Sequence, residues 1–529
     1  MARPAPPASS AESAWQAQRV RWTAYYEQHL QDRLRWAKHF IAERHRQPAR
    51  LKAHVASLFA LLRQARARPA FHPLAVEVIA ALHPWPGRWG RWSEWEEALC
   101  WAVAVCAQAG WPAQQARFLG ELAHILFYTG RPTEAAEVGQ GAIALAQQHG
   151  EALALAYGGT ALVASLVIAG QRAAAQATLA RLLDDALVRA PCEPAQARAA
   201  AMLRLKAADL QRRQGNLEAA VAAVSEVIAL LERLAADDAH LLAHAHRDRS
   251  VMALALGDYD LAAADLDRAQ ALFAQAEELF GLALVFSSRG LLAWNRGDLV
   301  EAEAAIRQGI ALTEQVNAQW HLVHEIGNLG LVYLCQGELH RALQHFEQQR
   351  VMAAQLGEVK EAKRAIGNRG VARLHLGDYA EAKADLEEEL AFFGGQAYQA
   401  YVGCTLVNLS WCSAALGNQE RALALAEAAR ALGEQTGSLA LRIVALRCLA
   451  ECLSPQARAA PLRQALALAR GRRRFDEAAC LLSLAGTVDD EAERAVLWQE
   501  GRRLLEAMQA TAWVAQRQPH QPPRLPLLY

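Results

Sequence analysis

The sequence has little of what marks a membrane protein or a secreted protein. It contains no charge-free run of 18 or more apolar residues, so we expect no membrane-spanning helix. The opening stretch MARPAPPASSAES lacks the apolar core of a signal peptide and predicts a disordered leader over residues 1–13. The nine cysteines form no C-x-x-C pair and are scattered through apolar helix faces, which favours buried thiols in a reducing cytoplasm over disulfides or a zinc site.

Motifs for catalysis and nucleotide binding are also missing. No G-x-x-x-x-G-K-[ST] occurs, nor even a Gly-Lys dipeptide, which excludes a P-loop. No G-x-S-x-G nucleophile motif is found. His321 and His324, in the stretch WHLVHE, have neither the H-E-x-x-H order nor a third ligand. The sequence therefore predicts a protein that is not an enzyme and that uses no cofactor and no metal ion.

What the sequence does contain is an internal repeat. A glycine followed five residues later by an alanine recurs eight times, at intervals of 40 to 45 residues. The glycines are Gly130, Gly170, Gly215, Gly257, Gly297, Gly337, Gly377 and Gly417, and the alanines are Ala135, Ala175, Ala220, Ala262, Ala302, Ala342, Ala382 and Ala422. A register kept over eight copies predicts a repeat protein.

Each copy predicts two amphipathic helices joined by a tight turn. In the copy NRGVARLHLGDYAEAKADL, a first helix should end at Leu376 and a second should open at Tyr379. Glycine suits the left-handed residue that ends the first helix, and the Asp or Asn after it can accept from the free N–H groups of the second. The alanine lies where the two helices press together, so a larger residue would overpack the contact. Neighbouring pairs must stack to bury their apolar faces.

The repeat unit resembles the tetratricopeptide repeat (TPR). The family pattern N-L-G…G-D-Y-x-x-A appears over residues 328–342 and again over residues 368–382. The period of about 40 residues, against about 34 in the basic TPR, is similar to the arrays of kinesin light chains and of bacterial STAND-type regulators. The resemblance covers residues 112–485. It implies an all-α fold, a right-handed superhelical solenoid of antiparallel helix pairs, whose concave groove holds a protein or an extended peptide.

Other regions flank the array. Residues 14–111 form a Trp-rich helical extension, with helices expected over 11–45, 50–67, the stretch from Pro73 to Leu82, and 94–109, the last opened by a capping box of Ser93 and Glu96. Its stretch PWPGRWGRWSEWEEALCW resembles the entry to the TPR arrays of STAND regulators. At the other end, residues 486–515 predict a capping helix and residues 516–529 a Pro-rich, disordered tail.

The N-terminal extension carries most of the charge asymmetry. Residues 1–70 hold 13 Lys and Arg but four Asp and Glu, a net charge of +9, so the rest of this neutral chain carries −9. Interleaved basic and aromatic residues suit phosphate contact and base stacking. An alternative function is therefore a regulator that contacts nucleic acid through residues 15–68 and uses the array as its sensor. The competing interpretation is a cap packed on the first repeat, with its arginines in water.

The candidate binding residues follow from the repeat register. Asn328, Asn368 and Asn408 each stand nine residues before a turn glycine, and Ser288 takes this place in the preceding unit. In the TPR family this position faces the concave groove, and asparagines there grip the backbone of extended peptides, so the resemblance implies the same role here. An amide can bond both the N–H and the C=O of a strand because it has a donor and an acceptor. In the alternative interpretation these residues only bond a neighbouring helix.

Charged and aromatic residues accompany this set. Arg249, Arg289 and Arg369 each stand eight residues before a turn glycine and would form a basic strip for a carboxylate-rich ligand, or else pair with acids of adjacent helices. Helical spacing places further residues near the same face: Trp294, Trp320, His324, Arg364 and Trp411. A tryptophan in a groove can anchor a ligand, although core packing is its commoner use.

Overall fold

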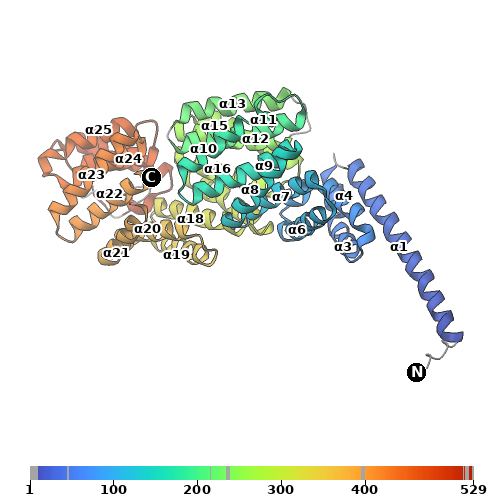
Figure 1. The fold of residues 1–529 in the computed structure, drawn as a ribbon. Coiled ribbons are helices and arrows are strands. Elements are labelled where there is room, and N and C mark those ends of the chain that lie inside the picture. Colours follow the sequence, from blue (N-terminus) through green and yellow to red (C-terminus); the bar gives the residue numbers. More distant parts are fainter. Residues whose placement is uncertain are drawn as a thin grey trace, which may run out of the picture.

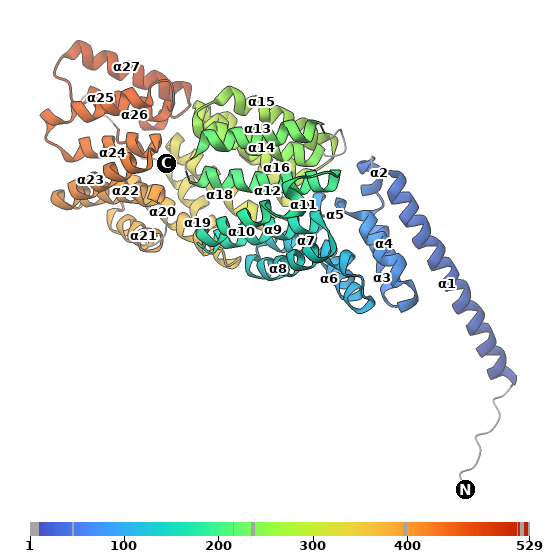
Figure 2. The ribbon, with the colours of Figure 1, turned by 45° about the horizontal axis from the view of Figure 1, so that its top comes forward.

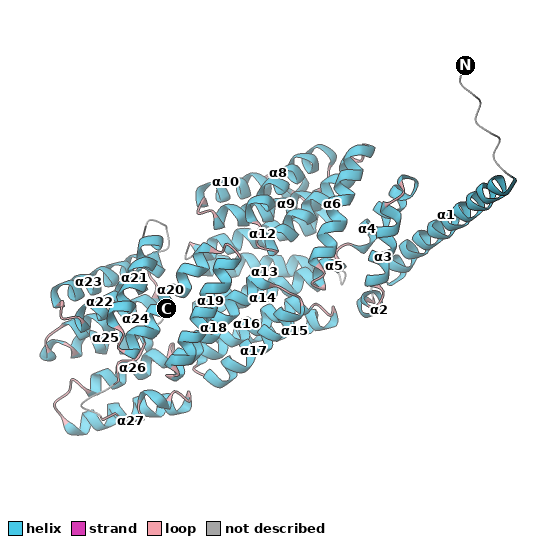
Figure 3. Ribbon diagram, turned by 90° about the horizontal axis from the view of Figure 1, so that it is seen from below, coloured by secondary structure: helices cyan, strands magenta, loops and turns pink. Residues whose placement is uncertain are grey.

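The chain folds as an elongated stack of helices (Figure 1). The computed structural model describes residues 10–44, 47–214, 216–233, 239–394, 399–515, 517–518 and 523–526. All regular elements in these residues are helices, packed mainly against their neighbours in sequence (Figure 3). The predicted all-α solenoid of helix pairs is therefore confirmed. None of the described helices combines the length and the apolar character that crossing a bilayer requires.

Each repeat has a first and a second helix. The first helices are α7 (Pro112–Tyr128), α9 (Ala152–Ile168), α12 (Pro194–Arg213), α14 (Ala239–Leu256), α16 (Leu279–Arg296), α18 (Gln319–Gln336), α20 (Val359–Leu376), α22 (Gln399–Ala415) and α24 (Leu439–Cys452). The second helices are α8 (Pro132–His149), α10 (Arg172–Leu183), α13 (Leu217–Arg233), α15 (Tyr259–Gln275), α17 (Leu299–Gln315), α19 (Leu339–Gln355), α21 (Tyr379–Phe393), α23 (Gln419–Thr436) and α25 (Ala459–Ala469). The boundary predicted between Leu376 and Tyr379 is found in α20 and α21. A short extra helix, α11 (Ala186–Arg189), fills the longer unit before α12.

The turns between paired helices have the geometry that the repeat demands. Seven of the eight turn glycines have φ between +75° and +93°, a conformation that glycine adopts without strain, and Gly215 lies outside the described residues. The eight alanines that follow are all fully buried. Asp258, Asp298 and Asn418 cap the second helix with a side-chain hydrogen bond, whereas Asp378 does not. Packing at the alanine is thus common to every unit, while the cap is optional.

The first helices line the inner, concave side of the array. Most successive first helices contact one another, as α7 does with α9 and α22 with α24, whereas second helices pack chiefly on the first helices beside them. Helices that approach closest lie on the inside of a curved stack. We call inner face the side of the first helices that carries the residues 17, 13, 9, 6 and 2 positions before the turn glycine, which fall on one side of a 3.6-residue helix.

The N-terminal extension contains α1 (Ser10–Arg44), α2 (Pro48–Lys52), α3 (Val55–Arg66), α4 (His72–Leu82), α5 (Trp85–Arg88) and α6 (Trp92–Ala109). Helix α1 packs on α2 to α4 by its C-terminal half, and the rest projects away from the body in every view (Figures 1 and 2). The helix expected over residues 50–67 is broken into α2 and α3.

The start of α6 differs from the predicted one. Its N-cap is Arg91, which forms an ion pair with Glu94 (Nε–Oε2 2.5 Å), so the expected capping box of Ser93 and Glu96 is not used. The segment before α6 folds back onto the array. A Cβ added to Gly90 would come within 2.5 Å of the Val316 side chain, and Trp92 packs edge-on against Phe280 of α16.

The C-terminal helices also return to the array. Helices α26 (Arg474–Ala485) and α27 (Glu491–Ala507) follow α25, and the residues around them reach the turns of three earlier units. Tyr259 donates to the carbonyl of Arg472 (2.7 Å), Trp513 donates to the carbonyl of Cys335 (2.9 Å), and Gly297 lies against Met508. The predicted cap therefore packs along the side of the solenoid and shares one core with α16 to α24.

Part of the tail expected to be disordered is docked. Of residues 516–529, the segment 523–526 has no regular secondary structure, and Leu525 is buried with 1% of its surface exposed. The guanidinium of Arg447 donates to the carbonyl of Leu525 (3.0 Å), and that of Arg524 lies 6.0 Å from the centre of the Trp411 ring. A backbone segment from the end of the chain thus lies against α22 and α24.

Candidate functional site

The four polar residues of the predicted ladder fall into two kinds. Asn328 on α18 and Asn368 on α20 are half-buried, and neither side chain hydrogen-bonds to another described residue. Ser288 and Asn408 are buried and bond their own helices, Ser288 to the carbonyl of Leu284 and Asn408 to that of Cys404, both at 3.0 Å. The two central amides therefore keep their donors and acceptors available on the inner face.

The side chains that share this part of the inner face differ in chemistry. Trp320 packs edge-on against His324, with ring centres 4.9 Å apart. Burial lowers the pKa of His324 to about 4, so its imidazole is neutral at neutral pH. Arg364 lies beside Glu361 (Nε–Oε2 3.0 Å), and the same carboxylate is 3.4 Å from His324. Around the two amides the face thus offers an aromatic wall, a neutral imidazole and a guanidinium paired with a carboxylate.

The arginines of the neighbouring register are engaged elsewhere. Arg249 donates to both oxygens of Asp265 at 2.7 Å, and Arg369 donates to Asp385 (2.6 Å) and Glu347 (2.7 Å). Arg289 forms an ion pair with Asp267. All four of these acids lie on second helices: Asp265 and Asp385 in the same unit as their arginine, and Asp267 and Glu347 in the preceding unit. The alternative interpretation of this set expected such pairing with adjacent helices.

Trp294 and Trp411, which the sequence predicts to lie near the groove, contact residues from the C-terminal part of the chain. Trp294 donates its indole N–H to the sulfur of Cys335 (3.1 Å), and Arg473 lies 5.9 Å from its ring centre. Trp411, only 4% exposed, packs edge-on against His375 and lies under Arg524. Both rings are therefore covered by residues that follow the repeats.

Sequence reasoning overlooked a cavity in another region of the inner face. It has a volume of about 650 Å³ including its open mouth, and it lies between α5–α7 and α14–α16. Its lining includes the inner-face residues Glu121, His124, Tyr128, Tyr157, His240 and His244 together with Glu278, and it is closed by His83, Arg88 and Trp92 from the N-terminal extension. The one signal in the sequence is the stretch HLLAH, which puts two histidines one helical turn apart.

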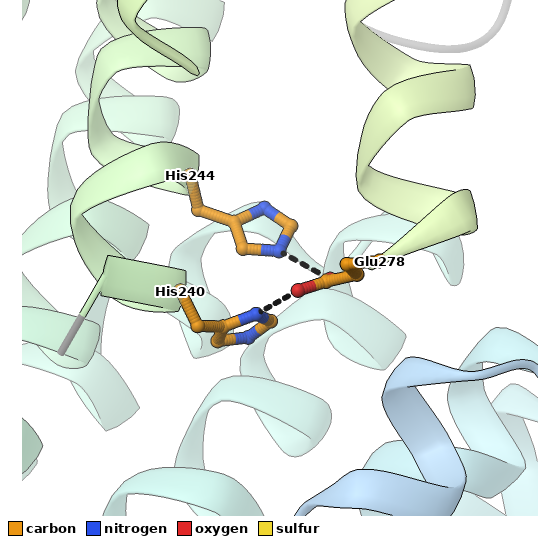
Figure 4. Close-up of side chains that lie close together, drawn as sticks. All are labelled: His240, His244 and Glu278. Atoms are coloured by element: carbon orange, nitrogen blue, oxygen red, sulfur yellow. Dashed lines mark hydrogen bonds and ion pairs between the residues drawn. The ribbon is translucent and has the colours of Figure 1, made fainter. Parts of the chain in front are cut away.

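The two histidines converge on one carboxylate (Figure 4). The Nδ1 atom of His240 is 2.6 Å from Oε2 of Glu278, and Nε2 of His244 is 3.6 Å from Oε1. Glu278 is the N-cap residue of α16 and is buried. Burial lowers the pKa of His240 to about 4. Burial alone would raise the pKa of Glu278, but the charge and hydrogen bonds of the two histidines outweigh it and lower that pKa. Glu278 is therefore ionised at neutral pH.

Comparisons with known proteins support the fold. No protein-family model and no curated protein matches the sequence. The solved APC/C heterotetramer Cut9–Hcn1 aligns over 93% of this chain and 95% of its own, with 11% identity and a TM-score of 0.51. A Rap protein complexed with competence and sporulation factor aligns over 66% and 97% (14% identity, TM-score 0.48), and a STAND protein with a TPR sensor from Pyrococcus horikoshii over 77% and 55% (11% identity, TM-score 0.43). The chain is a TPR-like helical repeat protein.

Proposed function

We propose that the chain is a non-enzymatic binding scaffold whose inner face holds an extended protein or peptide segment. Asn328 and Asn368 carry the proposal, because they are half-buried, stand in the same register of successive first helices and make no hydrogen bond to another described residue. Each amide can bond a donor and an acceptor of a strand backbone, which requires no particular ligand side chain. Trp320 beside them offers an apolar surface for one side chain of the ligand.

The chain's own C-terminal segment supports this proposal. Residues 523–526 form no regular secondary structure, and two of their carbonyls, of Leu525 and Pro526, accept from the guanidinium of Arg447 at 3.0 and 3.4 Å. Arg524 in this segment lies over Trp411, which stands six residues before a turn glycine and so belongs to the inner face. One first helix of this array, α24, thus binds a backbone segment through side-chain hydrogen bonds to its carbonyls.

The test compares two kinds of asparagine. The variant Asn328→Ala/Asn368→Ala removes the free amides, and Asn408→Ala is the matched control because its amide bonds its own helix. A partner captured from the native host by the wild type is identified, and its affinity is then measured by calorimetry. Loss of several backbone hydrogen bonds of about 1 kcal/mol each should weaken binding at least about tenfold in the double variant. Equal affinity of the double variant and the wild type, at equal helicity by circular dichroism, contradicts the proposal.

We also place the scaffold in a reducing cytoplasm. All nine cysteines are free, and six of them are buried: Cys106, Cys335, Cys412, Cys448, Cys452 and Cys480. Two, Cys100 and Cys192, are exposed, which differs from the expectation of buried thiols throughout. Free thiols persist where glutathione and thioredoxin keep them reduced.

A second candidate function rests on α1. Three aromatic side chains in its projecting half, Trp15, Trp22 and Tyr25, are 65%, 64% and 66% exposed, and Arg19 and Arg21 lie between them. Exposed aromatic and basic residues in alternation suit a nucleic-acid backbone and its bases. Binding to single-stranded DNA should then fall steeply with salt and be lost in Trp15→Ala/Trp22→Ala, whose substitutions touch no packed surface. Salt-independent or absent binding would exclude this function.

A further inference from the structure

The cavity beside α14 brings together three side chains that could hold a metal ion. His240 and His244 lie one turn apart on α14, so their rings project from the same side of that helix. Glu278 at the start of α16 brings its carboxylate to both rings. One atom from each of the three residues can be chosen so that all lie within 4.8 Å of one another. Zinc with ligands at about 2.0–2.1 Å in tetrahedral geometry separates them by about 3.3 Å, and the observed contacts of 2.6 and 3.6 Å lie on either side of that value.

We propose that His240, His244 and Glu278 bind a divalent transition-metal ion, best fitted by zinc, with a coordination position open to the cavity. Two imidazoles and one carboxylate are a ligand set that zinc uses where it keeps an open fourth position. All three residues line the cavity, so a water molecule or an anionic group of a small ligand can complete the coordination sphere. His124, Tyr128 and Tyr157 surround that space and would contact the fourth ligand.

The charge at this site supports a cation. Both ion pairs of Glu278 are with histidines, and its carboxylate is buried. A buried carboxylate is stabilised by nearby positive charge, and Arg88 lines the same cavity. The buried pair of His246 and Asp265 differs, because Asp265 also binds the guanidinium of Arg249. A metal ion at Glu278 would supply the charge that an arginine supplies at Asp265.

The surroundings also hold the ligands in place. The His244 ring packs edge-on against Phe273 with centres 4.9 Å apart, and the two histidine rings lie 4.6 Å from each other. Both imidazoles are half-buried, and Glu278 is buried. Fixed rings lose little freedom when a metal ion binds, which favours tight binding.

The experiment measures metal content and affinity on the full chain without a histidine tag. The wild type is loaded with Zn²⁺, dialysed and assayed by mass spectrometry of the metal, then titrated with Zn²⁺ by calorimetry. We expect one Zn²⁺ per chain, and binding at least about 100-fold weaker in His240→Ala/His244→Ala and in Glu278→Gln. The control is His39→Ala/Glu43→Ala, which removes an exposed pair on α1 and should leave binding unchanged.

A spectroscopic arm separates a site from scattered binding to surface histidines. Co²⁺ in a tetrahedral or five-coordinate site absorbs visible light far more strongly than octahedral Co²⁺ on a surface, so the wild type should develop this band and both variants should lack it. The proposal is overturned if the wild type holds no more Zn²⁺ than the folded variants, or if it shows no such band. If the double histidine variant loses helicity, Glu278→Gln, which keeps the shape of the side chain, decides the outcome by the same two measurements.

Discussion

Two regions of the inner face, one at α14 and one at α18 and α20, use one register for different chemistry. At 17 and 13 residues before the turn glycine, α14 carries His240 and His244, whereas α20 carries Lys360 and Arg364. Over α14 the N-terminal extension closes the face into a cavity, while on α18 and α20 the amides Asn328 and Asn368 stay half-buried without a partner. The repeat decides where a side chain points, and the residue placed there decides what it can bind.

Two buried carboxylates show the same contrast in electrostatic terms. Glu278 contacts two histidines, and its pKa is lowered. Glu325 on α18, fully buried, accepts a hydrogen bond from Ser287, and burial raises its pKa to about 7. One acid is thus held ionised and the other close to protonation at neutral pH. Burial alone does not set the charge of an acid; the groups that face it do.

The largest effect, on zinc binding, is expected when α14 receives the residues that α20 carries at the same positions of the repeat. The variant His240→Lys/His244→Arg gives α14 the two residues of α20, and the new cations can pair with Glu278, so the fold should persist. Zinc binding should weaken more than about 100-fold, because both imidazole ligands are gone. Calorimetric titration with Zn²⁺ and circular dichroism measure the two properties. Retained zinc affinity would show that the histidines are not the ligands and would remove the contrast between the two regions.

The second prediction concerns Glu325 and pH. Its pKa is raised from about 4.3 in an unfolded chain to about 7 in the folded one. The protonated acid therefore contributes stability that is fully present below about pH 4 and is lost as pH rises through 7. Glu325→Gln, always neutral, should match the wild type near pH 4 and be more stable by up to about 4 kcal/mol at pH 9. Urea unfolding at both pH values measures this difference.

A difference that stays constant with pH would contradict this account of Glu325. Glu278→Gln serves as the comparison, because its acid is already ionised at neutral pH and depends on two histidines. That variant should lose stability at pH 7 instead of gaining it at high pH. Stability changes of opposite sign in the two variants would establish that the surroundings of Glu278 favour the ionised acid and those of Glu325 the protonated one.

The smallest effect is expected at the buried turn alanine, which the two regions share. Ala262→Leu, in the second helix beside the cavity, and Ala342→Leu, in the central stretch, enlarge fully buried turn alanines. Each should cost about 1–3 kcal/mol by overpacking, and the two costs should be similar because the turn is the same. Ala264→Leu on α15 is the control, since that side chain is exposed and should change stability little. Unequal costs, measured by urea unfolding, would mean that the framework itself differs between the two regions.

Much of the candidate site followed from the repeat register. Counting back from the turn glycines identifies Asn328 and Asn368 as candidates, because helical spacing places equivalent residues on the same side of successive helices. The same count could not separate them from Asn408, whose amide bonds the carbonyl of Cys404. Nor could it show that Arg369 pairs with Asp385 and Glu347. Whether a polar side chain is engaged depends on its neighbours in the folded array.

The sequence by itself determined the helix pairs, because the glycine turn and the buried alanine are local requirements that each unit repeats. Only the tertiary structure decided what closes the array. Small rotations between units add up over the whole stack, and they bring Trp92 to Phe280, Trp513 to Cys335, and residues 523–526 to Arg447. The cavity arises in the same way, since α5 and α14 meet only after the chain has curved through several repeats. Glu278 meets His240 and His244 for the related reason that neighbouring units pack against each other.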